Sequence, residues 1–324
     1  MEVRYLVVFC ILTIVSIIYY GFAKSLGIVD KPNHRSSHTR VTVRGGGIIF
    51  PIAALLWFLI FDFQHALMIL GLVLIASISF LDDIYSLNRK IRFFTQFLAL
   101  SLAFYDLRLF QHLDWYLLPI FYFVALGIIN AINFMDGING ITGLYSLVFF
   151  GTLLVLHQNM PIFEEELINY QILAILAFLI FNLRKKALMF AGDIGSISVA
   201  YLMIYFMTQW FLNGGGWTVI LILLIFGADV FVTMATRLLN RERLTEPHRK
   251  HLYQLLANEG KIPHIPVAIL FAVLQGIFNY FVFIRTETTP STLQGLGIIL
   301  TTGLFYILIK QTLKKRFSKA EQGS

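Results

Sequence analysis

Long apolar segments recur along the chain, with few charged residues inside them. Each segment has about 17–22 residues, the length that an α-helix needs to cross the ~30 Å hydrocarbon core of a bilayer. The apolar runs are continuous and lack the alternation of a membrane β-strand, so helices are expected. We predict eleven membrane spans, at residues 3–23, 46–61, 66–81, 91–106, 116–134, 141–157, 167–182, 195–212, 217–235, 264–284 and 293–310.

The composition agrees with a membrane protein. Hydrophobic residues make up 58% of the 324 residues and charged residues only 13%, and the mean hydropathy is +0.76. A soluble protein of this size could not cover so much apolar surface with polar groups. Because no linker, low-complexity tract or internal repeat is evident, we expect one all-α, polytopic membrane domain over residues 1–324.

The single cysteine, Cys10, lies within the first predicted span. It has no second cysteine for a disulfide and no zinc cluster to join, so we expect a small buried apolar side chain. The span itself is long enough to cross a bilayer and lacks a small-residue cleavage site. We therefore expect a retained helix and not a signal peptide.

The basic residues predict the orientation of the spans. Eleven crossings put the termini on opposite sides, and the positive-inside rule then predicts an outer N-terminus and a cytoplasmic C-terminus. The net charge of +7 is thus concentrated on the cytoplasmic face, where loop 135–140 and the basic tail 311–324 also lie. Of the 25 Lys and Arg residues, 22 follow odd-numbered spans, at 24–45, 82–92, 183–194, 236–263 and 310–324.

Two adjacent carboxylates, Asp82 and Asp83, end the third predicted span on this face. The helix dipole disfavours anions at a helix C-terminus, and polar groups beside hydrocarbon are costly and usually functional. A metal, a cationic substrate or a proton-accepting role would explain them. The alternative is that they only pair with Arg89, Lys90 or Arg92.

A second polar group comprises Asn130, Asn133 and Asp136 near the end of the fifth span. Their spacing of three residues puts them on nearly one helix face. Such a stripe can form hydrogen bonds between helices. However, Asp136 is flanked by Gly137 and followed by Gly140, which favours a ligand site.

Two more acids lie near or within spans. Asp193, between Gly192 and Gly195, opens the eighth span and is either a binding residue or an ordinary helix cap. Asp229 lies inside the ninth span, eight residues before Arg237. It is either a structural acid bonded to a neighbouring helix or part of a polar cavity, and the sequence leaves both open.

Two cytoplasmic loops suit anionic phosphate groups. The first loop, 29–47, interleaves basic, imidazole and hydroxyl side chains and ends with Arg44 and three glycines, whose backbone can approach a phosphate. Its charges are otherwise explained by membrane topology alone. In loop 236–263, His248 and His251 flank Arg249 and Lys250, a set that suits a diphosphate. A transition metal would need a third soft ligand, and none is evident.

In chain order these motifs are Asp-Asp, Asn-x-x-Asn-x-x-Asp-Gly-x-x-Gly, Gly-Asp-x-Gly-Ser and His-x-x-His. The set resembles the polyprenyl-phosphate N-acetylhexosamine-1-phosphate transferases, the superfamily of the bacterial WecA and MraY enzymes. The resemblance covers about residues 24–262. The first loop and the His-Arg-Lys-His-Leu-Tyr-Gln segment look most like the WbpL-type branch, which initiates O-antigen or capsule units.

The resemblance implies an enzyme of the bacterial inner membrane with a cytoplasmic active site. It would transfer N-acetylhexosamine-1-phosphate, or a 6-deoxy variant, from a UDP-sugar to undecaprenyl phosphate and release UMP. This is the first membrane step of a cell-surface polysaccharide pathway. No nucleic-acid partner is expected, and a homodimer, the sugar and the pathway stay open.

The resemblance also implies roles for individual residues. Mg²⁺, with Mn²⁺ as an alternative, would bind Asp193 and Asn133, and the lipid phosphate would meet Asp82 and Asp83. The expected catalytic set is Asp82, Asp83, Asp193 and His248. The expected substrate-binding set contains the uridine contacts Asp136 and Asn139, the diphosphate and sugar contacts Arg249 and His251, the phosphate-neutralising Arg44 and Lys90, and the neighbouring Asn130, Asn133 and Lys250.

The chain departs from the superfamily pattern at a few positions. Asn139 stands where most bacterial relatives have Asp. Its amide can both donate to and accept from uracil, so we expect that uridine binding is retained, and the nucleotide preference stays open. Ala191 replaces a usual Met, and Val41 and Val43 stand where the WbpL-like branch has prolines.

A membrane transporter or flippase for an anionic substrate is the alternative function. It predicts ionisable groups along the bilayer midplane and often inverted repeats. Here the spans are nearly free of charge except for Asp229, and the polar motifs crowd one end, which favours interfacial chemistry. For that chemistry we expect direct displacement, with a covalent Asp–phosphosugar intermediate as the competing route.

Overall fold

The fold is almost entirely helical. The computed structural model describes residues 2–32, 37, 40–243, 248–286 and 288–322. The predicted phosphate-binding loops are thus described except for 33–36, 38–39 and 244–247. The α-helices are α1 (Glu2–Ser25), α2 (Ile49–Ile60), α3 (Ala66–Tyr85), α4 (Arg89–Asp106), α5 (Leu109–His112), α6 (Leu118–Met135), α7 (Ile141–Asn159), α8 (Glu165–Asn182), α9 (Gly192–Trp210), α10 (Leu224–Leu239), α11 (Leu252–Gln254), α12 (His264–Asn279) and α13 (Thr292–Gln322).

Each of the eleven predicted spans lies largely on helical structure, so the multi-pass, all-α membrane fold is confirmed. Nine helical stretches of the described chain are long and apolar enough to cross a membrane. The other two are α2, which has only 12 residues, and α4, which opens with three basic residues and ends in Asp106. Eleven crossings and their orientation stay predictions.

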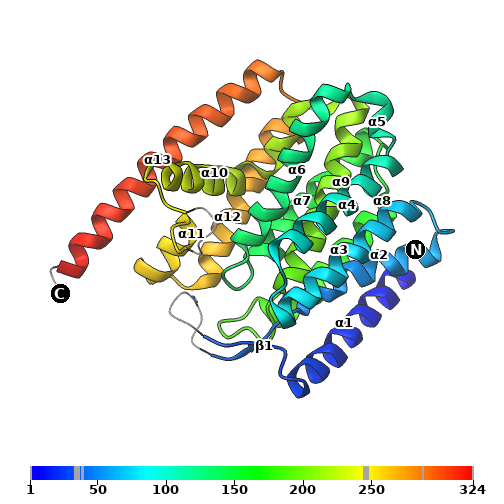
Figure 1. The fold of residues 1–324 in the computed structure, drawn as a ribbon, viewed down its shortest axis with the longest axis horizontal. Coiled ribbons are helices and arrows are strands. Elements are labelled where there is room, and N and C mark those ends of the chain that lie inside the picture. The colour runs from blue at the N-terminus through cyan, green and yellow to red at the C-terminus, as the bar shows by residue number, and fades with distance from the viewer. Residues whose placement is uncertain (1, 33–36, 38–39, 244–247, 287, 323–324) are drawn as a thin grey trace.

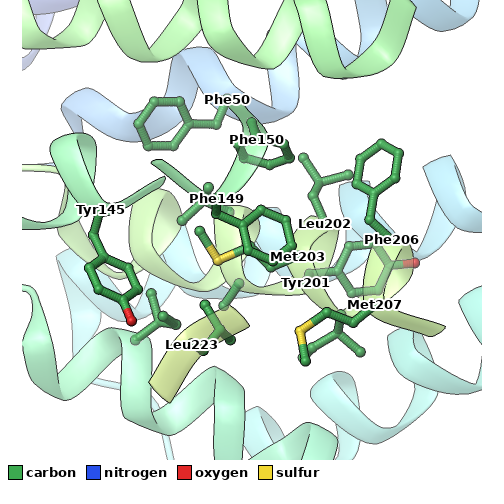
Figure 2. Packing of buried hydrophobic residues seen from close by; sticks show 14 of the residues in the cluster. Phe50, Tyr145, Phe149, Phe150, Tyr201, Leu202, Met203, Phe206, Met207 and Leu223 are labelled. Atoms are coloured by element: carbon green, nitrogen blue, oxygen red, sulfur yellow. The ribbon is translucent and has the colours of Figure 1, made fainter. Parts of the chain in front are cut away.

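Helix α9 is the centre of the bundle. It packs against α2, α3, α4, α6 and α7. In the span that it forms with η3, 89% of the most apolar 18-residue stretch is buried inside the protein. Figure 2 shows Tyr201, Leu202 and Phe206 of α9 meeting Phe149 and Phe150 of α7 in this core. Rings this large leave little free volume, so neighbouring helices are held in one register.

The outermost helices are α1 and α13, which lie at opposite edges of the bundle (Figure 1). Of the most apolar 18-residue stretch of each helix, only 28% is buried inside the protein in α1 and only 11% in α13. Cys10 is exposed on α1, so the expectation that it is buried was wrong. In lipid, an outward apolar side chain carries no penalty, and the sequence pattern alone does not tell which face of a wholly apolar helix is packed.

A short two-stranded sheet, which the all-α prediction did not contain, organises the first loop. Strands β1 (Val29–Asp30) and β2 (Thr42–Val43) are antiparallel, and Val43 also forms a parallel bridge with Met189. The chain then forms the 3₁₀ turn η1 (Gly46–Ile48) and enters α2. The first loop is thereby attached to the segment that precedes α9.

The later helices are interrupted. The ninth span consists of the 3₁₀ segment η4 (Trp217–Leu223) followed by α10, and Figure 1 shows α10 turned across α13. Wider π turns extend three other helices, at η3 (Phe211–Gly215), η5 (Leu255–Glu259) and η6 (Tyr280–Ile284), and η2 (Trp115–Leu117) is a 3₁₀ turn before α6. Such breaks are common near functional sites.

A polar cluster joins four helices at the end of the bundle opposite the basic loops. His65, just before α3, contacts Asp106 of α4 through Nδ1 at 2.6 Å and Glu164, before α8, through Nε2 at 3.3 Å. The Tyr205 hydroxyl of α9 lies 2.8 Å from the same Nδ1. Burial alone would lower the pKa of His65, but the hydrogen bonds and charges of Asp106 and Glu164 outweigh it and raise the pKa to about 9.

This cluster makes stability depend on pH in a definite direction. A histidine pKa raised on folding stabilises the folded state fully below the unfolded value of about 6.5, and the contribution is lost as the pH rises through about 9. The test variant is His65→Asn, because His65 has a left-handed backbone with a φ of 55°, which Asn tolerates. The variant should lower the unfolding temperature in detergent at pH 6 and much less at pH 10.

The matched control is His112→Asn, since His112 is exposed at the end of α5. It should leave the unfolding temperature unchanged at both pH values. An equal loss for His65→Asn at pH 6 and pH 10 would show that the ion pairs contribute nothing.

Candidate active site at the basic end of the bundle

An arginine from the first loop bridges two carboxylates from different helices. Arg44 Nε lies 2.6 Å from Asp83 Oδ1 at the end of α3, and Arg44 Nη2 lies 3.0 Å from Asp193 Oδ1 at the start of α9. The Tyr19 hydroxyl of α1 donates to the Arg44 carbonyl at 2.7 Å. The Asp83 side chain is fully buried, so it requires such a partner. Arg44 therefore holds three separate segments together.

The three glycines after Arg44 allow this close approach. A Cβ on Gly47 would lie 2.3 Å from the Gly195 Cα, and a Cβ on Gly46 would lie 2.8 Å from the Met189 Cβ. Gly46 and Gly47 also donate backbone hydrogen bonds to the carbonyls just before α9. Gly45 has a φ of +82°, which few other residues adopt. The glycine triplet thus packs the first loop directly onto α9.

Asp83 also caps α9. Its two carboxylate oxygens accept hydrogen bonds from the backbone N–H groups of Asp193 at 3.0 Å and Ile194 at 3.1 Å. An anion is favourable at a helix N-terminus, where N–H groups have no partner within the helix. The carboxylate that is badly placed for the dipole of α3 is therefore well placed for that of α9. The sequence could not show this, because the two helices are far apart in the chain.

Asp82 has different partners. It is buried, accepts a hydrogen bond from the Leu87 backbone N–H at 2.6 Å, and lies 2.5 Å from Arg92 Nη1. Of the three basic residues considered for this pair, Arg92 forms an ion pair with Asp82. Arg92 also lies 3.7 Å from Asp193 Oδ2, so it joins the charge network, whereas Lys90 is exposed on the first turn of α4.

The end of α6 meets the start of α9. Asn133 Nδ2 donates to Asp193 Oδ1 at 3.2 Å and to Ser196 Oγ at 3.0 Å. Asp136 Oδ1 accepts from the Thr142 hydroxyl at 2.6 Å, and burial raises the pKa of Asp136 to about 6, an effect that the Thr142 hydrogen bond only partly offsets. Asn130 is exposed and donates to its own helix, away from this contact.

A polar cavity opens between these segments. It contains the predicted Arg44, Asn133, Asp136, Asn139 and Asp193. The Asn139 amide Nδ2 donates to the Arg184 carbonyl at 2.8 Å, which turns Asn139 toward loop 183–191. The described residues that line the cavity are Asp30, Ser37, Arg44, Asn133, Asp136, Gly137, Ile138, Asn139, Asn182, Phe190, Gly192, Asp193, Gln254 and His264.

Several cavity residues were not among the predicted site residues. His264 Nδ1 faces the Asn139 backbone N–H at 3.4 Å, and Asn182 Oδ1 accepts from the Gly140 N–H at 2.7 Å. Gln254 follows the predicted His-x-x-His segment by three residues. A single His or Asn at a helix end forms no recognisable spacing pattern, so His264 and Asn182 could not be predicted. Gln254 could have been, because it directly follows a predicted motif.

The His-x-x-His segment lies beside the cavity and not in its wall. His251 is 2% exposed and its Nδ1 lies 3.0 Å from Asp229 Oδ1, while Lys250 pairs with Glu242 at the surface. The His248 ring is 4.9 Å from that of His251. Burial, and then the nearby positive charges, lower the pKa of His248 to about 4, so its ring is neutral at pH 7.

Arg249 also sits in this segment, half-buried. The described residues His248, Arg249, Lys250 and His251 are not among those that line the cavity. The contact of Asp229 with His251 answers the question left by the sequence: Asp229 is an acid bonded to a neighbouring segment.

The donor set at Asp193 fits a magnesium ion. Among the described residues, no three His, Cys, Asp or Glu side chains gather as a metal cluster. Magnesium needs only one or two protein oxygens, because it keeps several waters and binds substrate phosphates. The Asp193 carboxylate remains partly accessible from the cavity, and Asn133, which lines the same cavity, carries an amide oxygen as a second possible ligand. These oxygen ligands suit Mg²⁺ better than a softer metal.

Comparisons with known proteins show which enzymes the chain is similar to. The model of glycosyl transferase family 4 matches residues 65–211. A probable undecaprenyl-phosphate N-acetylglucosaminyl 1-phosphate transferase of Bacillus subtilis is 24% identical over 84% of this chain and 81% of its own length. The undecaprenyl-phosphate α-N-acetylglucosaminyl 1-phosphate transferase of Yersinia pestis is 29% identical over 74% of this chain and 72% of its own.

A third relative is the phospho-N-acetylmuramoyl-pentapeptide-transferase of Listeria innocua, 28% identical over 52% of this chain and 62% of its own length. The predicted resemblance is thereby confirmed at the level of the superfamily. The WbpL-type branch stays a prediction.

The contact between the first loop and α9 predicts that Gly47→Ala is destabilising. The added methyl group would meet backbone atoms of Gly195, so one of the two segments must shift, at a cost of about 1–3 kcal/mol. We expect a lower unfolding temperature in detergent. Gly21→Ala is the control, because its Cβ would meet nothing within 4 Å. Equal unfolding temperatures for the two variants would contradict the close packing.

Proposed function

Because the chain is similar to the WecA/MraY-like polyprenyl-phosphate sugar-1-phosphate transferases, we propose that it transfers N-acetylhexosamine-1-phosphate, or a 6-deoxy variant, from a UDP-sugar to undecaprenyl phosphate. The relatives' names support the lipid acceptor and the type of sugar. The observation that carries the proposal is the convergence of Arg44, Asp83, Asn133 and Asp193 from four separate segments beside one polar cavity.

The residues present suit phosphoryl transfer, which needs alignment and charge neutralisation more than covalent help. A Mg²⁺ ion held by Asp193 and Asn133 would neutralise the diphosphate and polarise its phosphorus. Arg44, at the edge of the same cavity, supplies a fixed guanidinium for phosphate oxygens. Asp136 and Asn139, further along the cavity wall, offer the carboxylate and amide groups that recognise a nucleobase.

The proposed step is a single displacement. An oxygen of the lipid phosphate attacks the phosphorus that carries the sugar, and the bond from that phosphorus to the UMP oxygen breaks, so the negative charge leaves on UMP. A phosphate monoester has a second pKa near 6 and is largely dianionic at neutral pH, so it needs little help from a base. The contacts of Asp82 and Asp83 with arginines and backbone N–H groups favour an orienting role for both.

The proposed setting is the cytoplasmic face of a bacterial inner membrane, at the start of a cell-surface polysaccharide such as O-antigen or capsule. The concentration of basic loops at the site end of the bundle supports this orientation. A transporter is less well supported, since the buried Asp229 has fixed partners in His251 and in the Leu252 backbone N–H, whereas a transport pathway needs ionisable groups that are free to bind a substrate.

The activity test is UMP release by the purified protein in detergent, given undecaprenyl phosphate and a panel of UDP-N-acetylhexosamines. We expect release that requires both Mg²⁺ and the polyprenyl phosphate, with the lipid product identified by mass. Asp193→Asn should lower the turnover by at least roughly 100-fold, since it removes charge from the proposed metal site.

The control is Asp114→Asn, at an exposed site on the opposite end of the bundle, which should retain wild-type turnover. UMP release without any lipid acceptor, or normal turnover of Asp193→Asn at limiting Mg²⁺, would contradict the proposal. Labelled phosphosugar trapped on the protein during turnover would replace direct displacement by the covalent route.

A further inference from the structure

Asp229 is a fully buried carboxylate with an unusually complete set of donors. Its Oδ1 lies 3.0 Å from His251 Nδ1 and accepts from the Thr233 hydroxyl at 3.2 Å. Its Oδ2 accepts from the backbone N–H groups of Leu252 at 2.9 Å and Tyr253 at 3.4 Å. Asp229 therefore caps the helical segment 252–259 from a different helix, in the way that anions stabilise helix N-termini.

The last helix supports this carboxylate from the other side. Tyr306 and Lys310 of α13 are each only 7% exposed, although α13 is otherwise mostly exposed. The Tyr306 hydroxyl lies 3.2 Å from the Leu252 N–H and hydrogen-bonds Asp229, and Lys310 Nζ donates to the Thr233 hydroxyl at 2.6 Å. A buried lysine is costly in a membrane helix and needs a partner, and Asp229 supplies the opposite charge.

The capped segment reaches the cavity. Gln254, one of the cavity residues, accepts a hydrogen bond through Oε1 from the His251 backbone N–H at 3.2 Å. The Tyr253 hydroxyl donates to the Phe134 carbonyl at 2.9 Å, directly after Asn133 in the chain, and a Cβ on Gly137 would lie 2.2 Å from that hydroxyl. The segment 251–254 thus joins Asp229 to the end of α6.

The contact with Asp229 also selects one form of the His251 ring. A carboxylate only accepts hydrogen bonds, so Nδ1 must carry the proton, and Nε2 is then the remaining polar atom. Nε2 is buried and has no hydrogen-bond partner among the residues that the structure describes. A buried polar atom without a partner is uncommon, and next to a ligand cavity it points to a group that binds there.

We propose that Asp229 is a positioning residue for the proposed transfer: on a support formed by Tyr306 and Lys310, it fixes His251 in the Nδ1-protonated form and holds Gln254 on the cavity wall. His251 lies directly behind the cavity wall, and we assign the diphosphate or sugar of the bound nucleotide as the partner of its Nε2. The inference rests on the proposed function, and it assigns to α13 a part in the site in addition to spanning the membrane.

The first test is a double-mutant cycle on kcat, with Asp229→Asn, His251→Gln and the double variant. Positioning residues behind a ligand-binding group typically contribute roughly 10–100-fold. We expect each single variant to lower kcat within this range. The kcat of the double variant should lie within about threefold of that of the slower single variant, because Asp229 acts through His251. Independent effects that multiply in the double variant would overturn the inference.

The second test does not depend on activity. In protein labelled with ¹⁵N-histidine, the His251 signal, identified by its loss in His251→Gln, should show protonated Nδ1 and unprotonated Nε2 at pH 8. In Asp229→Asn it should move toward the Nε2-protonated form. A wild-type ring protonated at Nε2 would overturn the inference even where UMP release is normal. Absence of UMP release with the expected wild-type signal would instead count against the proposed function.

A third variant covers the case in which Asp229→Asn does not fold. Tyr306→Phe removes only the supporting hydroxyl and keeps the carboxylate, so the ring form should be retained while kcat falls by a smaller factor. Tyr280→Phe is the matched control, since Tyr280 is half exposed on the outer part of η6. Equal kcat values for the two tyrosine variants would remove α13 from the proposal.

Discussion

The structure depends on one ionic contact, in which the Arg44 guanidinium lies between the carboxylates of Asp83 and Asp193. Buried charges are tolerated only when they are paired and hydrogen-bonded, so each member of this group requires the others. The glycines around Arg44 follow from the same requirement, because the first loop must reach α9 at backbone contact. The contact thus explains why a loop, the end of α3 and the start of α9 meet at one place.

A second polar centre, around Asp229, lies on the other side of the α6 end. The two centres are linked through α6, since Asn133 bonds to Asp193 and the next residue, Phe134, accepts from Tyr253. Both centres use a carboxylate to cap the N-terminus of a helix that is remote in sequence. This arrangement satisfies helix ends inside a membrane protein, where water is scarce, and leaves side chains directed at a shared cavity.

Much of the fold could be predicted, because a membrane span is a continuous run of about twenty apolar residues that can be read directly from the sequence. The eleven runs predicted in this way lie largely on helical structure. Arg44, Asn133, Asp136, Asn139 and Asp193 were also predicted, and all line the cavity. These residues could be predicted because polar side chains next to an apolar span are costly and usually have a function. The resemblance to a known superfamily then supplied a chemistry that the spacing alone left open.

Other features depend on contacts between distant segments, which no local pattern records. The different partners of Asp82 and Asp83 are set by α4 and α9, and the burial of His251 is set by Asp229 and α13. The sheet of the first loop pairs two short strands that lie a dozen residues apart and is bridged to the chain before α9. A helix that is apolar on every face also gives no sign of which face is outward, so the exposure of Cys10 could not be predicted.

The most direct test of the central claim is disulfide cross-linking between the first loop and the segment before α9, in a Cys10→Ala background. Val43 and Met189 are bridge partners on neighbouring extended segments, which lie ~4.8 Å apart, so cysteines at both positions should form a disulfide under mild oxidation in native membranes. Cysteines at Val43 and Asn213, which lies at the opposite end of the bundle, should not. Failure of the first pair, or equal cross-linking of the second, would contradict the account.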